Sequence, residues 1–426
     1  MNLPKYGFII LLIAFLLRLG FIFGTHSYIN PEVVEPGVIA HALITGKGFS
    51  FAVPGSAINL PTASQPPLFP YLLAGLYILF GENELAYLAL AIIQTLLSIW
   101  LCYLVYRIGT IAFNERTGLV AMLFSAVYPI FIIYSGRTTN TMISILAVAW
   151  FLYLFFQFTE RPTNRFRNII LLGISAGLAI FAESIMLSFI ILGFLWYLLV
   201  QWRTKKSVSI RFLVVAILIS AAVVLPWTIR NYLVFHKFVA VRTMFGMNLW
   251  QGNNPQATGT NTLPDGKPMF DFPPEYYNLS LTEPDRDTIL LNAAKQFIFE
   301  NPGKAARLFL KKCYYFWWFP PNNIVTPAAA KYANLMWFPF LLLLIFVLIG
   351  TGYAIKNKCY FALGIFWLLF FNYMVVYGIT HFGHFRYRAP IEPYLLILAA
   401  YGLTNLIRQI ISKEQEKLKK IKTDEI

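Results

Sequence analysis

Two glutamates, Glu32 and Glu35, stand three residues apart just after an apolar run that is long enough to cross a membrane. A partly buried carboxylate has a raised pKa and can take a proton from an acceptor hydroxyl or amine, which is the chemistry of a general base. If this stretch is helical, the spacing places both carboxylates on one face. Acidic residues also favour a solvated helix start without any catalytic role. The spacing alone leaves both interpretations open.

The residues that follow the glutamates favour a short helix. Pro36 is tolerated in a first helical turn, and Gly46 and Gly48 indicate a helix end. We expect this helix to lie against the outer face of the membrane, with one or both carboxylates at the depth of the lipid headgroups.

Three arginines near the outer ends of apolar runs, Arg230, Arg386 and Arg388, are candidates for binding a phosphate. A guanidinium group binds phosphate through two parallel hydrogen bonds, which lysine cannot do. Such cations stabilise the charge that develops on a phosphate leaving group. The alternative is interfacial anchoring, which applies more to Arg388 than to Arg386, because short outer loops otherwise avoid arginine.

Histidine and asparagine pairs offer further polar groups. His381 and His384 could bind a divalent cation, or could hydrogen-bond a pyrophosphate or sugar; with no third ligand evident, a hydrogen-bonding or structural role is favoured and no metal site is predicted. Asn253 and Asn254 supply two amides that suit sugar hydroxyls, but they equally suit a plain Asx-type turn.

Two further charged residues lie in or beside apolar runs. Glu183 occupies a tight outer turn, where a structural role is favoured over a catalytic one. Arg18 lies within the first apolar run, where an unpaired charge is costly. We expect it to pair with Glu35 or Glu183, or to extend toward the membrane surface.

The composition identifies the elements that must position these residues. Of 426 residues, 58% are hydrophobic and only 12% are charged, and the mean hydropathy is +0.62. Soluble domains carry about 25% charged residues, so this is an all-α polytopic membrane protein. Ten apolar runs approach the ~20 residues that a spanning helix needs, at about 7–24, 85–106, 118–135, 139–158, 168–182, 185–202, 212–229, 334–355, 359–379 and 389–407.

An eleventh apolar run, 68–80, is too short to assign by length. If it lies in the membrane interface, Lys and Arg gather in the loops at 107–117, 159–167 and 203–211 and in both terminal segments, on one side. The positive-inside rule places that side in the cytoplasm. The net charge of +15 therefore reflects membrane topology and indicates no nucleic-acid partner.

We accordingly expect an inner (plasma) membrane protein with cytoplasmic termini and an extracytoplasmic active site. Its parts are an N-terminal transmembrane module at 1–229 with a catalytic first outer loop at 25–84, an outer region at 230–333, C-terminal transmembrane helices at 334–410 and a basic tail at 411–426. In residues 287–319 apolar positions recur at helical spacing between basic residues, which is typical of a helix resting on a membrane surface.

The order of several short motifs resembles one family. These motifs are "AFLLRLGF", "IAHALITGKGFSF", "QPPLFPYLLAGLYILFG", "LPWTIRNY", "GMNLWQGNNPQATG" and "HFGHFRYRAPIEPYLLILAAYGL". The chain resembles bacterial membrane glycosyltransferases of the GT-C fold, in the dolichyl-phosphate-mannose protein mannosyltransferase-like group that includes the lipid A aminoarabinose transferases. Each motif alone is weak, but their order is fairly specific.

The resemblance implies transfer of a hexose or pentose from a polyprenyl-phosphate donor to a lipid, glycan or protein acceptor at the outer face of the bilayer. It implies that Glu32 occupies the position of the family's catalytic Asp and Glu35 that of a following acid. The sequence departs from the family pattern at these positions, with Glu32 in place of Asp and Pro36 in place of Tyr. It also departs at three others: Gln65 replaces a lysine near the donor phosphate, Asn140 replaces an acid, and Glu183 replaces a basic residue.

Two other functions remain open. A lipid-linked oligosaccharide ligase or polymerase would share the lipid carrier, but we would expect its site in one large late loop. A transporter or flippase would place ionisable residues near the midplane of its spans. Here the spans are nearly free of charge and the polar residues gather on the outer side, which favours an enzyme.

Overall fold

The computed structural model describes the chain except residues 1–2, 34, 53–57, 161–165, 206–209, 261, 263–271, 322–324, 326, 382, 384 and 425–426. The α-helices are α1 (Lys5–Thr25), α2 (Glu35–Ile44), α3 (Leu68–Phe80), α4 (Glu84–Ala112), α5 (Glu115–Val127), α6 (Pro129–Ile133), α7 (Thr141–Glu160), α8 (Phe166–Ala182), α9 (Met186–Arg203), α10 (Ile210–Phe235), α11 (Phe245–Gly252), α12 (Glu283–Glu300), α13 (Pro302–Trp317), α14 (Pro327–Lys356), α15 (Tyr360–Thr380) and α16 (Glu392–Asp424). Two short 3-10 helices are Pro274–Tyr277 and Phe385–Ile391, and strands β1 (Ser50–Ala52) and β2 (Asn59–Pro61) form one antiparallel pair.

The protein is an all-α polytopic membrane protein. Within the described residues, eight helices are long and apolar enough to span a membrane. The bundle core is made by α5, α7, α15 and α16 with their neighbours, and its fully buried members include Ile145, Phe366, Leu369 and Tyr394. The predicted all-α class is confirmed.

Two of the ten predicted runs form helices that are too short to count among the eight spanning ones. The run at 168–182 forms α8, which has 17 residues. The run at 118–135 is interrupted between α5 and α6, because Pro129 lacks an N–H and biases Tyr128 toward the extended conformation that it adopts. The expectation of one continuous helix there is wrong.

The break between α5 and α6 provides hydrogen-bond acceptors for the buried guanidinium group of Arg18. Its guanidinium donates to the carbonyl oxygens of Ser125 (3.2 Å) and Ala126 (2.8 Å) at the end of α5, and to the hydroxyl of Ser98 (2.7 Å). Arg18 is fully buried. The expectation that it pairs with Glu35 or Glu183, or extends to the surface, is wrong: it binds carbonyl groups that a helix end leaves without intrahelical partners.

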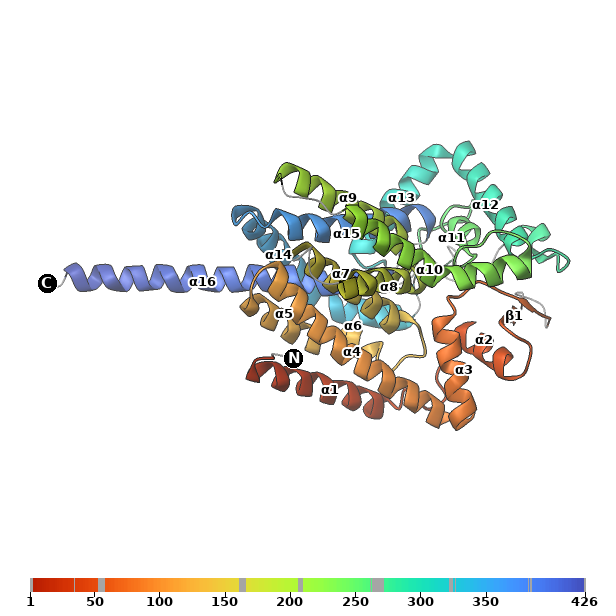
Figure 1. The fold of residues 1–426 in the computed structure, drawn as a ribbon, viewed down its shortest axis with the longest axis horizontal. Coiled ribbons are helices and arrows are strands. Elements are labelled where there is room, and N and C mark those ends of the chain that lie inside the picture. Colours follow the sequence, from red (N-terminus) through yellow and green to blue (C-terminus); the bar gives the residue numbers. More distant parts are fainter. Residues whose placement is uncertain are drawn as a thin grey trace.

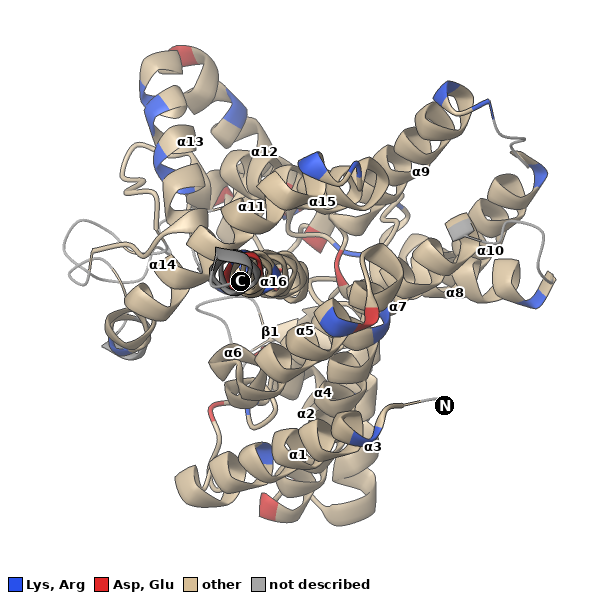
Figure 2. Ribbon diagram, turned by 90° about the vertical axis from the view of Figure 1, so that its left-hand side faces the viewer, with Lys and Arg blue, Asp and Glu red and all other residues tan. Residues whose placement is uncertain are grey.

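The connecting regions gather at one end of the bundle. Figure 1 shows α2, α3, β1, α11 and α12 at the end opposite the two termini, and α3 runs across the direction of α1 and α4. Figure 2 looks at the end that carries the termini, where Lys and Arg colour several helix ends. The regions at 25–84 and 230–333, far apart in sequence, therefore meet in space.

Candidate active site

Glu35 is the first residue of α2 and is partly buried. Its Oε2 accepts a hydrogen bond from the side-chain amide of Gln65, and no described residue donates to its Oε1. Glu32 precedes the helix and is exposed. The expectation that both glutamates share a helical face is therefore wrong, because α2 begins only at Glu35.

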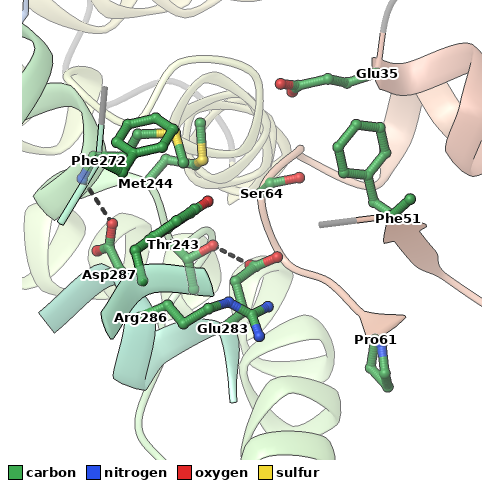
Figure 3. A pocket seen from close by; sticks show the side chains of 13 residues that line it. Glu35, Phe51, Pro61, Ser64, Thr243, Met244, Phe272, Glu283, Arg286 and Asp287 are labelled. Atoms are coloured by element: carbon green, nitrogen blue, oxygen red, sulfur yellow. Dashed lines mark hydrogen bonds between the residues drawn. The ribbon is translucent and has the colours of Figure 1, made fainter. Parts of the chain in front are cut away.

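A cavity of about 660 Å³ opens beside Glu35. Figure 3 shows the Glu35 side chain extending over this cavity beside Phe51, while Met244 and Phe272 form the facing wall. Aromatic and methionine side chains, including Tyr276 and Met247, make up much of the lining, and Glu283, Arg286 and Asp287 add charged groups to it. A largely apolar cavity beside a carboxylate with one free oxygen can hold an acceptor and orient its hydroxyl or amine.

A second, polar cavity of about 790 Å³ lies beyond Ser64 and Gln65. It collects side chains from distant parts of the chain, namely Asn140, Glu183, Arg242, Tyr377, His381, Arg386 and Tyr387. Ser64 and Met244 line both this cavity and the one beside Glu35, so the two adjoin. Two arginines at one cavity can hold an anionic group.

Arg242 stands in the loop between α10 and α11, at the edge of the polar cavity. Its side chain is partly buried, yet no described residue accepts a hydrogen bond from its guanidinium group. The nearby charges include Glu183, whose carboxylate accepts a hydrogen bond from the Tyr377 hydroxyl at 2.9 Å. A guanidinium with unused N–H groups beside a cavity is suited to bind an anion from outside the chain.

Burial sets the protonation of two groups here. Burial raises the pKa of Glu183, and the positive charge of Arg242 partly opposes this. Burial, Arg242 and Lys312 together hold the pKa of His381 well below its ordinary value, so the imidazole is neutral at physiological pH. His381 Nδ1 lies 2.6 Å from the Thr380 hydroxyl. The histidine therefore contributes hydrogen bonding and not charge.

An apolar groove of about 1590 Å³ continues from the polar cavity between α8, α9, α10 and α15. Ile185, Ile217 and Val224 line it, and Ile217 is 50% exposed on the outside of the bundle. Glu183, Arg242 and His381 line both the groove and the polar cavity. The groove is therefore mostly apolar, opens to the outside of the bundle at Ile217 and reaches Arg242.

Comparison with known proteins identifies this architecture. Residues 64–229 match the family of dolichyl-phosphate-mannose-protein mannosyltransferases. A structure of the oligosaccharyltransferase AglB from Archaeoglobus fulgidus, in complex with an inhibitory peptide and a dolichol-phosphate, aligns over 97% of this chain and 52% of its own, with 14% identity and a TM-score of 0.58. The oligosaccharyltransferase of that organism in complex with Zn and sulfate aligns over 94% and 49%, with 16% identity and a TM-score of 0.56.

The chain has the GT-C fold. It spans about half the length of these oligosaccharyltransferases. ArnT from Cupriavidus metallidurans, bound to undecaprenyl phosphate, aligns over 94% of this chain and 78% of its own, with 12% identity and a TM-score of 0.43. No curated protein matches the sequence. The predicted family resemblance is confirmed.

Within this GT-C fold, two predicted arginines make structural contacts. Arg230 donates to the carbonyl oxygens of Thr62 (2.8 Å) and Phe49 (3.1 Å), and its guanidinium lies over the Trp227 ring. Arg388 is fully buried and forms a salt bridge with Glu392 at 2.8 Å. Neither arginine lines the cavities beside Glu35. Both hold parts of the fold together.

The predicted asparagines are also engaged within the GT-C fold. Asn253 donates to the carbonyl oxygens of Leu249 and Ile379, both at 2.9 Å, and Asn254 donates to that of Trp250 at 2.9 Å. Both side chains are 3% exposed, so they shape a turn away from the cavities. His384 lies outside the described residues, and no group of three or more possible metal ligands occurs among the residues that the structure describes.

Three charged residues that line these cavities escaped the sequence analysis. Arg242 belongs to no motif and lies outside the apolar runs. Glu283 and Asp287 stand in the first turn and a half of α12, where acids are ordinary. Asp287 accepts the backbone N–H groups of Gly246 (3.0 Å) and Met247 (2.9 Å) and so caps α11 (Figure 3). Only the spatial arrangement distinguishes these residues.

Proposed function

We propose that this protein is a membrane glycosyltransferase that moves a single sugar, a hexose or a pentose, from a polyprenyl-phosphate donor to an acceptor. The observation that carries the proposal is the continuity of three spaces: the apolar groove, the cavity with Arg242 and Arg386, and the cavity beside Glu35. A lipid-linked sugar has the same order of parts, with an isoprenoid chain, a phosphate and then the sugar.

In this proposal the isoprenoid chain lies in the groove along Ile217 and Val224, where it buries apolar surface. Arg242 and Arg386 bind the phosphate, and the neutral His381 donates or accepts a hydrogen bond without adding charge. The sugar then reaches from the phosphate toward Glu35. Negative charge grows on the phosphate as the sugar leaves, so the two cations stabilise the transition state more than the ground state.

Glu35 acts as the general base. Gln65 holds its Oε2, which leaves Oε1 available to the acceptor. As the acceptor oxygen or nitrogen forms a bond with the anomeric carbon, its proton passes to Glu35 and the bond between that carbon and the phosphate oxygen breaks. The products are the glycosylated acceptor, free polyprenyl phosphate and a protonated Glu35, which returns its proton to water.

The membrane orientation belongs to the same proposal. Lys and Arg gather at the bundle end that carries the termini (Figure 2). The positive-inside rule supports a cytoplasmic position for that end, and we propose that Glu35 and Arg242 lie on the extracytoplasmic side.

The test uses purified protein in proteoliposomes with a panel of donors, namely undecaprenyl-phosphate monosaccharides and undecaprenyl-pyrophosphate oligosaccharides. We expect release of undecaprenyl phosphate from one or a few monosaccharide donors. Exclusive use of pyrophosphate-linked oligosaccharides would indicate a ligase instead. Donor movement between leaflets without any release would indicate a flippase and overturn the proposal.

A further inference from the structure

Glu283 makes contacts that its place in the chain does not suggest. It is the first residue of α12, but its carboxylate bonds to two remote segments. Its Oε1 accepts the backbone N–H of Ala63 at 2.9 Å and the Thr243 hydroxyl (Figure 3). Its Oε2 accepts the Thr62 hydroxyl. Thr62, Ala63 and Thr243 are all buried. One carboxylate at the edge of the cavity beside Glu35 thus joins three segments of the chain.

The two segments that meet at Glu283 carry the two halves of the site. Ala63 lies two residues before Gln65, whose amide holds Glu35. Thr243 directly follows Arg242. The Thr243 N–H also donates to the Ala63 carbonyl oxygen at 3.1 Å, so the segments contact each other as well. A shift of Glu283 would therefore move the base support and the cation relative to each other.

The carboxylate is suited to this role. Three donors converge on it, and hydrogen bonds to a charged acceptor are about twice as strong as those between neutral groups. Burial raises the pKa of Glu283, while the bonds from Thr243, Thr62 and Ala63 oppose the rise. Its position in the first turn of α12 adds the favourable field of a helix N-terminus.

We propose that Glu283 is a positioning residue that sets the separation between the Glu35 base and the Arg242 cation. The inference rests on the proposed function, because the separation matters only if a phosphate and an acceptor must be held together. Glu283 lines the cavity beside Glu35 but makes no hydrogen bond to Glu35 or Arg242. It acts through Thr62, Ala63 and Thr243.

The test compares Glu283→Ala and Glu283→Gln with a matched control on the same helix turn, Asp285→Asn. Asp285 pairs with the partly exposed Lys237 and lines none of the cavities beside Glu35. We expect Glu283→Ala to lower kcat by about 100-fold, the cost of a displacement near 1 Å. Binding of sugar-free undecaprenyl phosphate should change far less, because Arg242 remains. Asp285→Asn should match wild type in kcat and in binding of undecaprenyl phosphate.

The conservative variant Glu283→Gln distinguishes a loss of positioning from a general loss of folding. A glutamine at position 283 can accept from the Ala63 N–H and donate to the Thr62 hydroxyl, so Glu283→Gln should retain kcat within about 10-fold of wild type. Glu283→Ala combined with Gln65→Ala should cost no more than the larger single effect, because both act on Glu35. Additive losses would overturn the proposed link.

Amide hydrogen exchange supplies a readout that needs no turnover. Glu283→Ala should speed exchange at both 62–65 and 243–244, and Asp285→Asn at neither. Unchanged exchange at either segment, or wild-type kcat in Glu283→Ala, overturns this inference alone. Failure of wild-type protein to consume any donor would instead overturn the proposed function, and with it the positioning role of Glu283 in catalysis, even if the exchange result held.

Discussion

Two arginines, Arg388 in the 3-10 helix Phe385–Ile391 and Arg242 in the loop between α10 and α11, show how differently the same side chain is used. Arg388 is fully buried and pairs with Glu392. It also donates to the carbonyl oxygens of Phe316 (3.0 Å) and Trp317 (3.1 Å). Arg242 borders two cavities, and no described residue accepts its N–H groups. The first holds the fold together, and the second is available to a ligand. The two roles differ because the chain itself supplies hydrogen-bond acceptors to Arg388, whereas no described residue supplies one to Arg242.

The largest expected effect on stability comes from breaking the buried pair. Arg388→Ala leaves Glu392 buried without its partner, which costs about 3–5 kcal/mol in comparable cases. We expect a large fall in the free energy of unfolding, or failure to fold, measured by chemical denaturation in nanodiscs. The double variant Arg388→Met with Glu392→Leu should recover much of the loss, since both charges are then absent. A single variant that unfolds like wild type would show that this pair is not structural.

Arg242→Ala should give the opposite pattern. We expect the affinity for undecaprenyl phosphate to fall by about 10- to 100-fold, because a hydrogen bond to a charged group contributes about 1.5–3 kcal/mol. The unfolding midpoint should change far less than in Arg388→Ala, since no described residue accepts a hydrogen bond from this guanidinium and only its charge acts on Glu183 and His381. Isothermal titration calorimetry in detergent measures the affinity. Arg242→Lys keeps the charge but loses the planar fork, so it should rank between alanine and wild type.

The smallest expected effect concerns Glu183, which faces Arg242. Burial raises the pKa of Glu183, so the folded chain binds this proton more tightly than the unfolded chain does. Stability therefore falls as the pH rises from the ordinary glutamate value to the raised one, and the loss persists above it. Glu183→Gln cannot ionise, so its unfolding temperature should exceed that of wild type at neutral pH and converge with it in acid.

Thermal unfolding at several pH values tests this, with Glu82→Gln as the control because Glu82 is an exposed carboxylate paired with His41. Glu82→Gln should not produce the convergence. A Glu183→Gln protein that is less stable than wild type at neutral pH would show that the attraction of Arg242 and Arg386 outweighs burial.

The fold was largely predictable from the sequence, because apolar run length and Lys/Arg placement report directly on membrane crossing. The break before Pro129 was also visible in principle, since a residue preceding proline avoids the helical conformation. The role of Arg388 was not visible. Two of its partners are backbone carbonyls of Phe316 and Trp317, about 70 residues away, and every residue type has a carbonyl.

The candidate site was predictable only in part. Glu35 stood out by its place after the first span and by its resemblance to a family position, and Gln65 by a departure from that family. Arg242 and Glu283 carried no such signal, because their significance lies in which segments meet around them. A search for arginines and acids placed in polar loops between apolar runs would have included both, along with many solvated residues.

The most direct test of the account is a comparison of Glu35→Gln with Glu32→Gln in the donor-release assay. A general base contributes about 10²–10⁴-fold, so Glu35→Gln should lower kcat by that factor while still binding undecaprenyl phosphate through Arg242. Glu32→Gln should behave like wild type, because Glu32 is exposed and lies outside α2. If Glu32→Gln abolished release and Glu35→Gln did not, Glu35 would not be the base, and the proposed arrangement of donor, acceptor and carboxylate would be contradicted.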